Sequence, residues 1–281
     1  MRIDLHVHST ASDGTSPPGV VLAEAAQAGL DVVALTDHDT TAGWAEAAAA
    51  VPRTGVTLVP GAEISTQADG ISIHLLAYLQ DPADPALAAE TERTRTDRLS
   101  RARRMVDLIA RDHPLTWDEV QAQVEPGATV GRPHIADAMV AAGLVRDRDE
   151  AFATVLNNRS PYYVRHYAPD VVRAVQLVRG AGGVPVMAHP LAGRRGRTVS
   201  DDVIADMAAA GLAGLEVAHR DHEPEEREHL RGLARELDLF TTGSSDYHGT
   251  GKLNRIGENV TDPEVLEQIE AQGRGTPVVR P

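Results

Sequence analysis

The hydrophobic pattern of the first part of the chain alternates between two periods. Short runs of apolar, often β-branched residues, typical of buried strands, lie at residues 3–7, 31–36, 56–60 and 71–79. Amphipathic or alanine-rich segments, typical of helices, lie between them at residues 19–28 and 42–50. This alternation of strand and helix predicts a parallel α/β sheet or barrel.

The alternation stops at the proline-containing segment 81–85 and returns near residue 169. Between residues 86 and 167 the pattern is almost entirely helical. Beyond this segment we expect helices at residues 169–181, 203–210 and 224–237, and strands at residues 183–188, 212–217 and 240–243. We therefore predict one α/β domain in two parts, residues 1–85 and 168–281, separated by a helical insertion at residues 86–167.

Composition and charge narrow the function classes. With 281 residues, 42% of them hydrophobic, and no cysteine, the chain is an ordinary globular sequence without disulfides or thiolate zinc sites. A formal net charge of −14 opposes broad binding to nucleic acid, and the arginines between residues 93 and 104 are interpreted as a solvated helix face. Because no apolar run is long enough to cross a membrane and no signal peptide is visible, we expect a cytoplasmic protein without membrane association.

Histidine and carboxylate side chains gather where the expected strands end. His8, His38 and His189 lie at or just beyond the carboxyl ends of three strands. The other members of the group are His6 and His74 within strands, Glu63 after the strand at residues 56–60, and Asp246 and His248 after the strand at residues 240–243. The carboxyl ends of parallel strands meet at one edge of a sheet or barrel, where active sites form.

The spacing of these residues indicates a metal site. His6 and His8 lie two residues apart, so their rings share one face of a strand, and Asp246 and His248 repeat this spacing. An isolated His-x-His pair is more often structural than metal-binding, but two such pairs among further acids and histidines favour a metal. Imidazole and carboxylate ligands without thiolate suit zinc, manganese or iron.

Six short motifs, taken in chain order, resemble those of the PHP (polymerase and histidinol phosphatase) superfamily. They are His6-Val7-His8-Ser9, Ser12-Asp13-Gly14, Thr36-Asp37-His38-Asp39, Gly61-Ala62-Glu63, Ala188-His189-Pro190 and Ser245-Asp246-Tyr247-His248. The resemblance implies a distorted (β/α)7 barrel, here with an inserted α-helical cap. It also implies two or three bound divalent metals and the hydrolysis of phosphate esters.

The resemblance further implies three overlapping sets of metal ligands. The first set is His6, His8, Glu63 and Asp246; the second is Glu63, His74 and His189; the third is Asp13, His38 and His248. Some members of the superfamily carry histidine where this chain has Asp13. Since a carboxylate favours a harder ion, we expect manganese in preference to iron or zinc. Asp37 either orients neighbouring ligands or caps the helix that follows.

The helical insertion contains the segment Gly131-Arg132-Pro133-His134-Ile135-Ala136. This segment resembles a motif of the nucleoside 3′,5′-bisphosphate phosphatases and the related 5′-to-3′ exoribonucleases. A guanidinium group can donate two hydrogen bonds to phosphate, so Arg132 and His134 are the expected substrate-binding residues. The alternative is a helix cap with a surface arginine.

Asp246 and His222 are the expected catalytic residues. His222 follows the strand at residues 212–217 and is a candidate hydrogen-bond donor or general acid, while His219 faces either the site or the solvent. The remaining histidines lack a comparable context and are interpreted as surface residues: His113, His166 and His229.

These features together predict a metal-dependent phosphoesterase in which a metal-activated hydroxide attacks phosphorus. The expected substrate is a small phosphorylated nucleotide, either a nucleoside 3′,5′-bisphosphate or the 5′ end of a short oligonucleotide. The alternatives are a histidinol-phosphate-type phosphatase or a phosphodiesterase for another small ester, and a metal-binding regulatory barrel without activity. The last would tolerate degraded ligand positions, and none is degraded. No obligate protein partner is evident.

Overall fold

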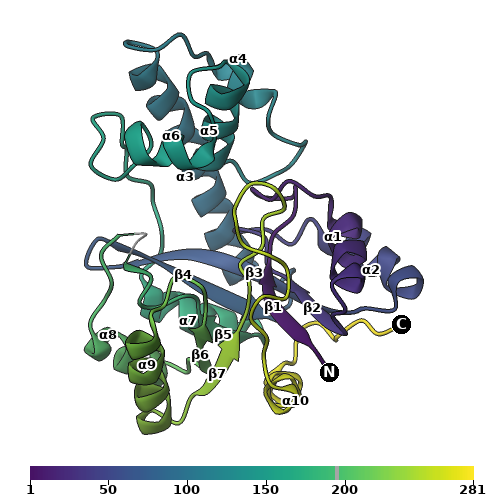
Figure 1. The fold of residues 1–281 in the computed structure, drawn as a ribbon. Coiled ribbons are helices and arrows are strands. Elements are labelled where there is room, and N and C mark those ends of the chain that lie inside the picture. The colour runs from purple at the N-terminus through teal and green to yellow at the C-terminus, as the bar shows by residue number, and fades with distance from the viewer. Residues whose placement is uncertain (194–195) are drawn as a thin grey trace.

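A seven-stranded sheet forms the centre of the molecule. The computed structural model describes residues 1–193 and 196–281, and within these ranges the strands follow one another in chain order. They are β1 (Ile3–Val7), β2 (Val32–Leu35), β3 (Thr57–Ala68), β4 (Ile71–Tyr78), β5 (Val184–Met187), β6 (Gly214–Ala218) and β7 (Phe240–Gly243). A parallel bridge between Val7 and Tyr247 joins the two ends of the sheet, which is therefore a nearly closed barrel, as expected (Figure 1).

Strand β4 departs from the predicted parallel arrangement. It runs antiparallel to β3 and to β5, whereas β1 to β3 and β5 to β7 are parallel. The turn from β3 to β4 consists of Asp69 and Gly70, with φ angles of 50° and 72°. A two-residue turn of this kind can only join antiparallel neighbours, because parallel strands need a long crossover. Strand β3 also continues beyond Pro60, so that Glu63 lies inside the strand instead of after it.

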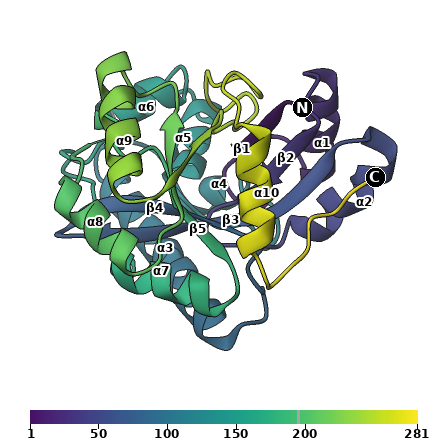
Figure 2. The same cartoon turned by 90° about the horizontal axis from the view of Figure 1, so that it is seen from below.

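Helices cover the outside of the barrel on both sides of the β3–β4 hairpin (Figures 1 and 2). They are α1 (Pro18–Gln27), α2 (Trp44–Thr54), α7 (Val171–Gly180), α8 (Asp201–Ala209) and α9 (Pro224–Glu236). Helix α10 (Pro263–Gln272) instead lies across the lower end of the barrel (Figures 1 and 2). Alternation within β2 divides the core: Val33 and Leu35 pack with α1 and α2, whereas Val32 and Ala34 belong to the cluster inside the barrel. Helix α10, which the sequence pattern did not predict, contributes Ile269 to that inner cluster.

The segment between β4 and α7 is helical, as the pattern predicted. Its helices are α3 (Pro85–Ile109), α4 (Trp117–Gln121), α5 (Arg132–Ala141) and α6 (Arg148–Thr154). They pack around a hydrophobic cluster of their own that includes Met105, Ile135 and Leu156, and they lie over the carboxyl ends of the parallel strands (Figure 1). None of the described helices combines the length and the apolar character that spanning a membrane requires.

Tyr78 connects β4 to β1 inside the barrel and provides a test of this packing. Its side chain is fully buried, and its hydroxyl donates a hydrogen bond of 2.9 Å to the carbonyl oxygen of Leu5. We expect Tyr78→Phe to lower the free energy of unfolding by about 1 kcal/mol, because a buried hydrogen bond is lost. Urea denaturation measures this change.

The matched control is Tyr162→Phe, which removes a 2.8 Å hydrogen bond to Asp112 at the surface. We expect a change below about 0.5 kcal/mol there, since exposed substitutions have small effects. Equal losses for the two variants would contradict a specific contribution from the Tyr78 hydroxyl.

Candidate metal centre

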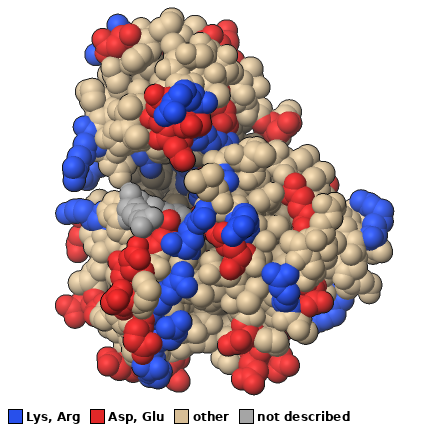
Figure 3. Space-filling view, viewed as in Figure 1, with Lys and Arg blue, Asp and Glu red and all other residues tan. Residues whose placement is uncertain are grey.

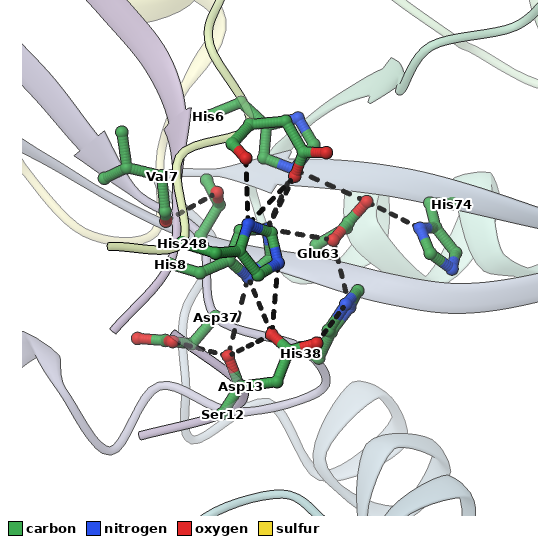
Figure 4. Close-up of polar contacts among 12 residues, drawn as sticks. His6, Val7, His8, Ser12, Asp13, Asp37, His38, Glu63, His74 and His248 are labelled. Atoms are coloured by element: carbon green, nitrogen blue, oxygen red, sulfur yellow. Dashed lines mark hydrogen bonds and ion pairs between the residues drawn. The ribbon is translucent and has the colours of Figure 1, made fainter. Parts of the chain in front are cut away.

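The nine predicted ligand residues lie together at the end of the barrel that faces helices α3 to α6, and Figure 4 labels all of them except His189 and Asp246. His6 lies in β1 and His8 follows it, while Glu63 and His74 lie in the neighbouring strands β3 and β4. The loops after β1, β2, β5 and β7 supply the others: Asp13, His38, His189, Asp246 and His248. The barrel therefore brings side chains from most of its strands, or from the loops that follow them, into one cluster.

Glu63 lies at the centre of this cluster and is 1% exposed. Its two carboxylate oxygens contact five imidazole rings. Oε1 lies 2.7 Å from Nδ1 of His74, 3.3 Å from Nε2 of His189 and 3.4 Å from Nε2 of His6. Oε2 lies 2.9 Å from Nδ1 of His38 and 3.2 Å from Nε2 of His8. A carboxylate in this position can bridge two metal ions, which is the role that the resemblance implies.

Asp246 and Asp13 provide the other two carboxylates. Oδ1 of Asp246 lies 3.4 Å from Nε2 of His6 and 3.3 Å from Nε2 of His8. Oδ1 of Asp13 lies 3.2 Å from Nε2 of His248, and its Oδ2 lies 3.6 Å from Nε2 of His38. The four side chains of His8, Asp13, His38 and His248 offer ligand atoms within 4.8 Å of one another, so the geometry adds His8 to the third set.

The electrostatics and the donor atoms fit divalent cations. Burial acts to raise the pKa of Glu63, but His74 and His38 outweigh it and hold the pKa well below its usual range. Burial lowers the pKa of His248 to about 3, together with His8 and Lys252, so its ring stays neutral. Three buried ring nitrogens lie close to a carboxylate oxygen but do not have hydrogen-bond geometry toward it: Nδ1 of His38, Nδ1 of His74 and Nε2 of His248. Carboxylate oxygens and imidazole nitrogens that converge in this way are the donors of a metal site.

Asp37 braces the loop that carries Asp13. Its Oδ1 accepts hydrogen bonds from the backbone N–H of Ser9 at 2.8 Å and from Oγ of Ser12 at 2.6 Å, and its Oδ2 accepts one from Oγ of Ser9 at 2.6 Å. Helix α2, by contrast, is preceded by Gly43 at its N-cap. Of the two roles left open by the sequence, the geometry therefore fits the orientation of neighbouring ligands.

The interpretation of the arginines of α3 as a solvated face is wrong for two of them. Arg98 is 8% exposed and Arg101 is 5% exposed, and both line the cleft beside the metal-ligand candidates. Nε of Arg98 lies 2.9 Å from Oδ2 of Asp39, and Nε of Arg101 donates to the carbonyl oxygen of Val164 at 2.6 Å. The helical spacing of these arginines with buried Met105 was the available signal, because all three project from one face.

Arg132 and His134 have different environments. Arg132 lines the cleft, and its Nη1 donates to the carbonyl oxygen of Leu156 at 2.9 Å and to Oδ1 of Asn158 at 2.8 Å. His134 is 4% exposed, and its Nδ1 accepts the backbone N–H of Gly131 at 3.1 Å. The structure thus differs from the expectation at His134, whose ring caps the first turn of α5 instead of lining the cleft.

The structure also gives His222 a different place from the expected one. Its Nδ1 donates to the carbonyl oxygen of Val217 at 2.9 Å, and its Nε2 accepts the backbone N–H of Leu191 at 3.1 Å. With both nitrogens bound to backbone, and with burial lowering its pKa, this ring fits loop support better than proton donation. His219 is fully buried, with Nε2 3.8 Å from Oδ2 of Asp246, so the solvent-facing alternative does not hold.

His166 is a correction to the set of surface histidines. Its Nε2 is buried without a hydrogen bond among the described residues, and the ring lines the cleft. Burial lowers the pKa of His166 to about 2, with Arg98 and Arg101 acting in the same direction. A histidine held neutral among guanidinium groups marks a region of positive potential.

Two further residues were not found by sequence reasoning. Glu216 of β6 is fully buried and accepts a 2.9 Å hydrogen bond from Nδ1 of His6. Lys252, the single lysine of the chain, places Nζ 3.0 Å from Oδ2 of Asp246. Glu216 is a single acidic residue in an otherwise apolar strand and belongs to no recognisable motif. Lys252 lies in a loop, where no hydrophobic periodicity indicates which way a side chain points.

A cleft of about 2210 Å³ opens between the helices α3 to α6 and the barrel, and the metal-ligand candidates His38, His74 and His189 are in its wall. The hollow is visible in Figure 3 below the upper group of helices, with Lys and Arg side chains near its rim. Among the described residues, eleven Lys and Arg side chains line the cleft against four Asp and Glu. The cleft therefore reverses the sign of a chain whose net charge is −14.

Comparisons with known proteins agree with this geometry. The PHP domain family matches residues 4–115. A 3′,5′-nucleoside bisphosphate phosphatase of Chromobacterium violaceum is 36% identical over 270 residues, covering 95% of each chain. A 5′-3′ exoribonuclease of Haemophilus influenzae is 32% identical over 260 residues, covering 92% of this chain and 94% of its own.

A solved structure from Bifidobacterium adolescentis, described as a candidate metal-dependent phosphoesterase, superposes with a TM-score of 0.95. It is 44% identical and covers 97% of this chain and 96% of its own. The chain therefore belongs to the PHP family of phosphoesterases and is a metal-dependent hydrolase.

Proposed function

We propose that the protein is a phosphatase of nucleoside 3′,5′-bisphosphates that uses two or three divalent metals, preferably manganese. The observation that carries this proposal is the arginine cluster, defined as Arg98, Arg101 and Arg132, in the same cleft as the metal-ligand candidates. Arg98 pairs with Asp39, but no carboxylate partner of Arg101 or Arg132 is present in the described part of the chain. Since buried cations without counter-ions are costly, the cluster favours binding of an anion.

A substrate with two phosphate groups fits this arrangement. One phosphate lies at the metal centre, and the other lies at the arginine cluster. Burial lowers the pKa of Arg101 to about 9, and Arg132 acts in the same direction, so a second anion would relieve the repulsion between them. The resemblance to a bisphosphate phosphatase over almost the whole chain supports this choice of substrate.

When bound, the metals activate a water molecule and neutralise charge on the reacting phosphate. The side chains of the protein hold the geometry around them. Asp246 directs Oδ1 toward His6 and His8, while Lys252 contacts its Oδ2. His134 caps the turn that carries Arg132, while the carbonyl oxygen of Leu156 and Oδ1 of Asn158 hold the guanidinium group. We further propose that residues 86–167 act as a cap, because they bring the arginine cluster to the cleft.

A second candidate substrate is the 5′ end of a short oligonucleotide. The cleft volume of about 2210 Å³ favours it, because sites for single small molecules typically measure about 300–1,000 Å³. Arg159, Arg165 and Arg197 line the cleft in addition to the arginine cluster. These residues offer contacts to further phosphates of a chain.

Glu63→Gln tests the metal centre. We expect this variant to lose metal affinity by more than about 100-fold, since it removes a shared ligand and not only a supporting contact. Bound Mn²⁺ per chain, measured by elemental analysis after dialysis, reports the loss, and phosphate release falls with it.

After chelation of the wild type, Mn²⁺ should restore more activity than Mg²⁺, because imidazole ligands favour the softer ion.

The control is Glu267→Gln, on the exposed face of α10. It should retain the Mn²⁺ content and the activity of the wild type. Normal Mn²⁺ content in Glu63→Gln would show that Glu63 is not a shared ligand.

Arg132→Ala tests the proposed substrate. Losing a charge-assisted contact to the second phosphate should cost about 2–4 kcal/mol of transition-state stabilisation, or roughly 30- to 1000-fold in kcat/KM. The loss should affect 3′,5′-bisphosphates, whereas a monophosphate or a small chromogenic ester should be hydrolysed almost as before. Steady-state kinetics with the two substrate classes measure this difference.

Arg103→Ala is the matched control, because Arg103 is exposed and lies two residues from Arg101 on α3. It should leave both substrate classes unaffected. A uniform loss in Arg132→Ala would place the guanidinium group at the reacting phosphate, and no loss at all would make Arg132 a structural residue.

Chain length separates the two candidate substrates. For a bisphosphate phosphatase, kcat/KM should not rise when nucleotides are added to a 5′-phosphorylated substrate. For an oligonucleotide enzyme, it should rise over the first few nucleotides and fall more steeply with salt, by about 0.7 logarithmic units per unit of log salt for each phosphate contacted. Kinetics on a length series at two salt concentrations decide between them.

A further inference from the structure

Glu216 lies in the middle of β6, and its carboxylate reaches a metal-ligand candidate of β1 and another of the loop after β5. The residue is fully buried. Its Oε1 accepts a hydrogen bond of 2.9 Å from Nδ1 of His6 and another from Oγ of Ser244. Its Oε2 accepts the backbone N–H of His189 at 2.8 Å. One carboxylate is thus joined to a member of the first ligand set and to a member of the second.

The contact with His6 determines which ring nitrogen carries the proton. An ionised carboxylate only accepts hydrogen bonds, so Nδ1 of His6 donates, and in the neutral ring the lone pair is then on Nε2. Nε2 points toward the metal centre, 3.4 Å from Oε1 of Glu63 and 3.4 Å from Oδ1 of Asp246. The contact with Glu216 therefore selects, for the neutral ring, the tautomer that binds a cation through Nε2.

The contact with His189 acts on the backbone. His189 has a φ angle of 31°, in the left-handed region that residues with a Cβ atom rarely adopt. The hydrogen bond to Glu216 holds this backbone in place just before Pro190. Nε2 of His189 then lies 3.3 Å from Oε1 of Glu63. A strained segment that carries a ligand depends on such support.

We propose that Glu216 is a positioning residue that fixes the ring of His6 and the backbone of His189, and thereby links the affinities of the first two metal sites. The proposal rests on the ligand sets given above, but not on the identity of the substrate. Supporting carboxylates of this kind orient imidazole ligands and raise their basicity, and their loss typically costs 10- to 100-fold in metal affinity.

Glu216→Gln is the sharpest variant, because glutamine offers one acceptor oxygen and one amide donor in place of two acceptors. With the amide oxygen toward His6, the NH2 group opposes the N–H of His189. With the amide reversed, the NH2 group faces Nδ1 of His6, which must then accept, so its proton moves to Nε2. Either orientation harms one of the two ligands, although the volume of the side chain hardly changes.

The test uses protein loaded with Mn²⁺ and dialysed against increasing concentrations of chelator, with the Mn²⁺ retained per chain measured by elemental analysis. We expect Glu216→Gln to release metal at roughly 10- to 100-fold lower chelator concentration than the wild type. The control is Glu258→Gln, which alters a largely buried carboxylate that pairs with Arg220 and Arg255 and has no contact with a ligand candidate among the described residues. It should retain Mn²⁺ as the wild type does.

Retention of Mn²⁺ by Glu216→Gln as in the wild type would overturn the proposal, and so would an equal loss in Glu258→Gln. If Glu216→Gln does not fold, the wild type is labelled with nitrogen-15 at its histidines and loaded with Zn²⁺. NMR then shows which ring nitrogen of His6 carries the proton. A proton on Nδ1 of His6 supports the proposal, and a proton on Nε2 contradicts it. Because both readouts use metal alone, failure to cleave bisphosphates would count against the proposed substrate and not against the role of Glu216.

Discussion

The burial of Glu63 is the constraint on which the rest of the site depends. An ionised carboxylate removed from water is costly unless positive or hydrogen-bonding groups surround it. Here the surrounding groups are imidazole rings contributed by β1, β4 and the loops that follow β1, β2 and β5. The nearly closed barrel brings these segments to one carboxylate. The polar cluster therefore depends on the curvature of the sheet and on the bridge between Val7 and Tyr247.

The β3–β4 hairpin contributes to the same constraint. Ser65 and His74 are direct partners in the antiparallel register, so Glu63 and His74 lie diagonally on one face. A shift of the register by one residue would turn His74 to the other face of the sheet. The Asp-Gly turn that fixes this register is visible in the sequence, yet the alternation of strands and helices favoured a parallel arrangement. The Asp-Gly turn, and not the overall alternation of strands and helices, determines the direction of β4.

The sequence located the ligand candidates because spacing and strand ends are local properties. His6 and His8 share a strand face, and Asp246 and His248 follow a strand, whatever the rest of the chain does. Glu216 could not be found in this way, because its function depends on contacts with His6 and His189, which are distant in sequence. The presence of a histidine after a strand was also not sufficient to identify a ligand candidate. His222 follows a strand as the ligands do, but both of its nitrogens bind backbone.

Arg98 joins the two parts of the molecule at a sensitive place. It projects from α3, but its guanidinium group contacts Asp39 and Ser65, which lie one and two residues beyond the ligand candidates His38 and Glu63. A tilt of α3 would therefore pull directly on the backbone that carries these ligands. Helices α3 to α6 are therefore not independent of the barrel, because Arg98 is a partner of both Asp39 and Ser65. A substitution of Arg98 would remove these contacts and so act on the geometry of the ligand candidates as well as on the wall of the cleft.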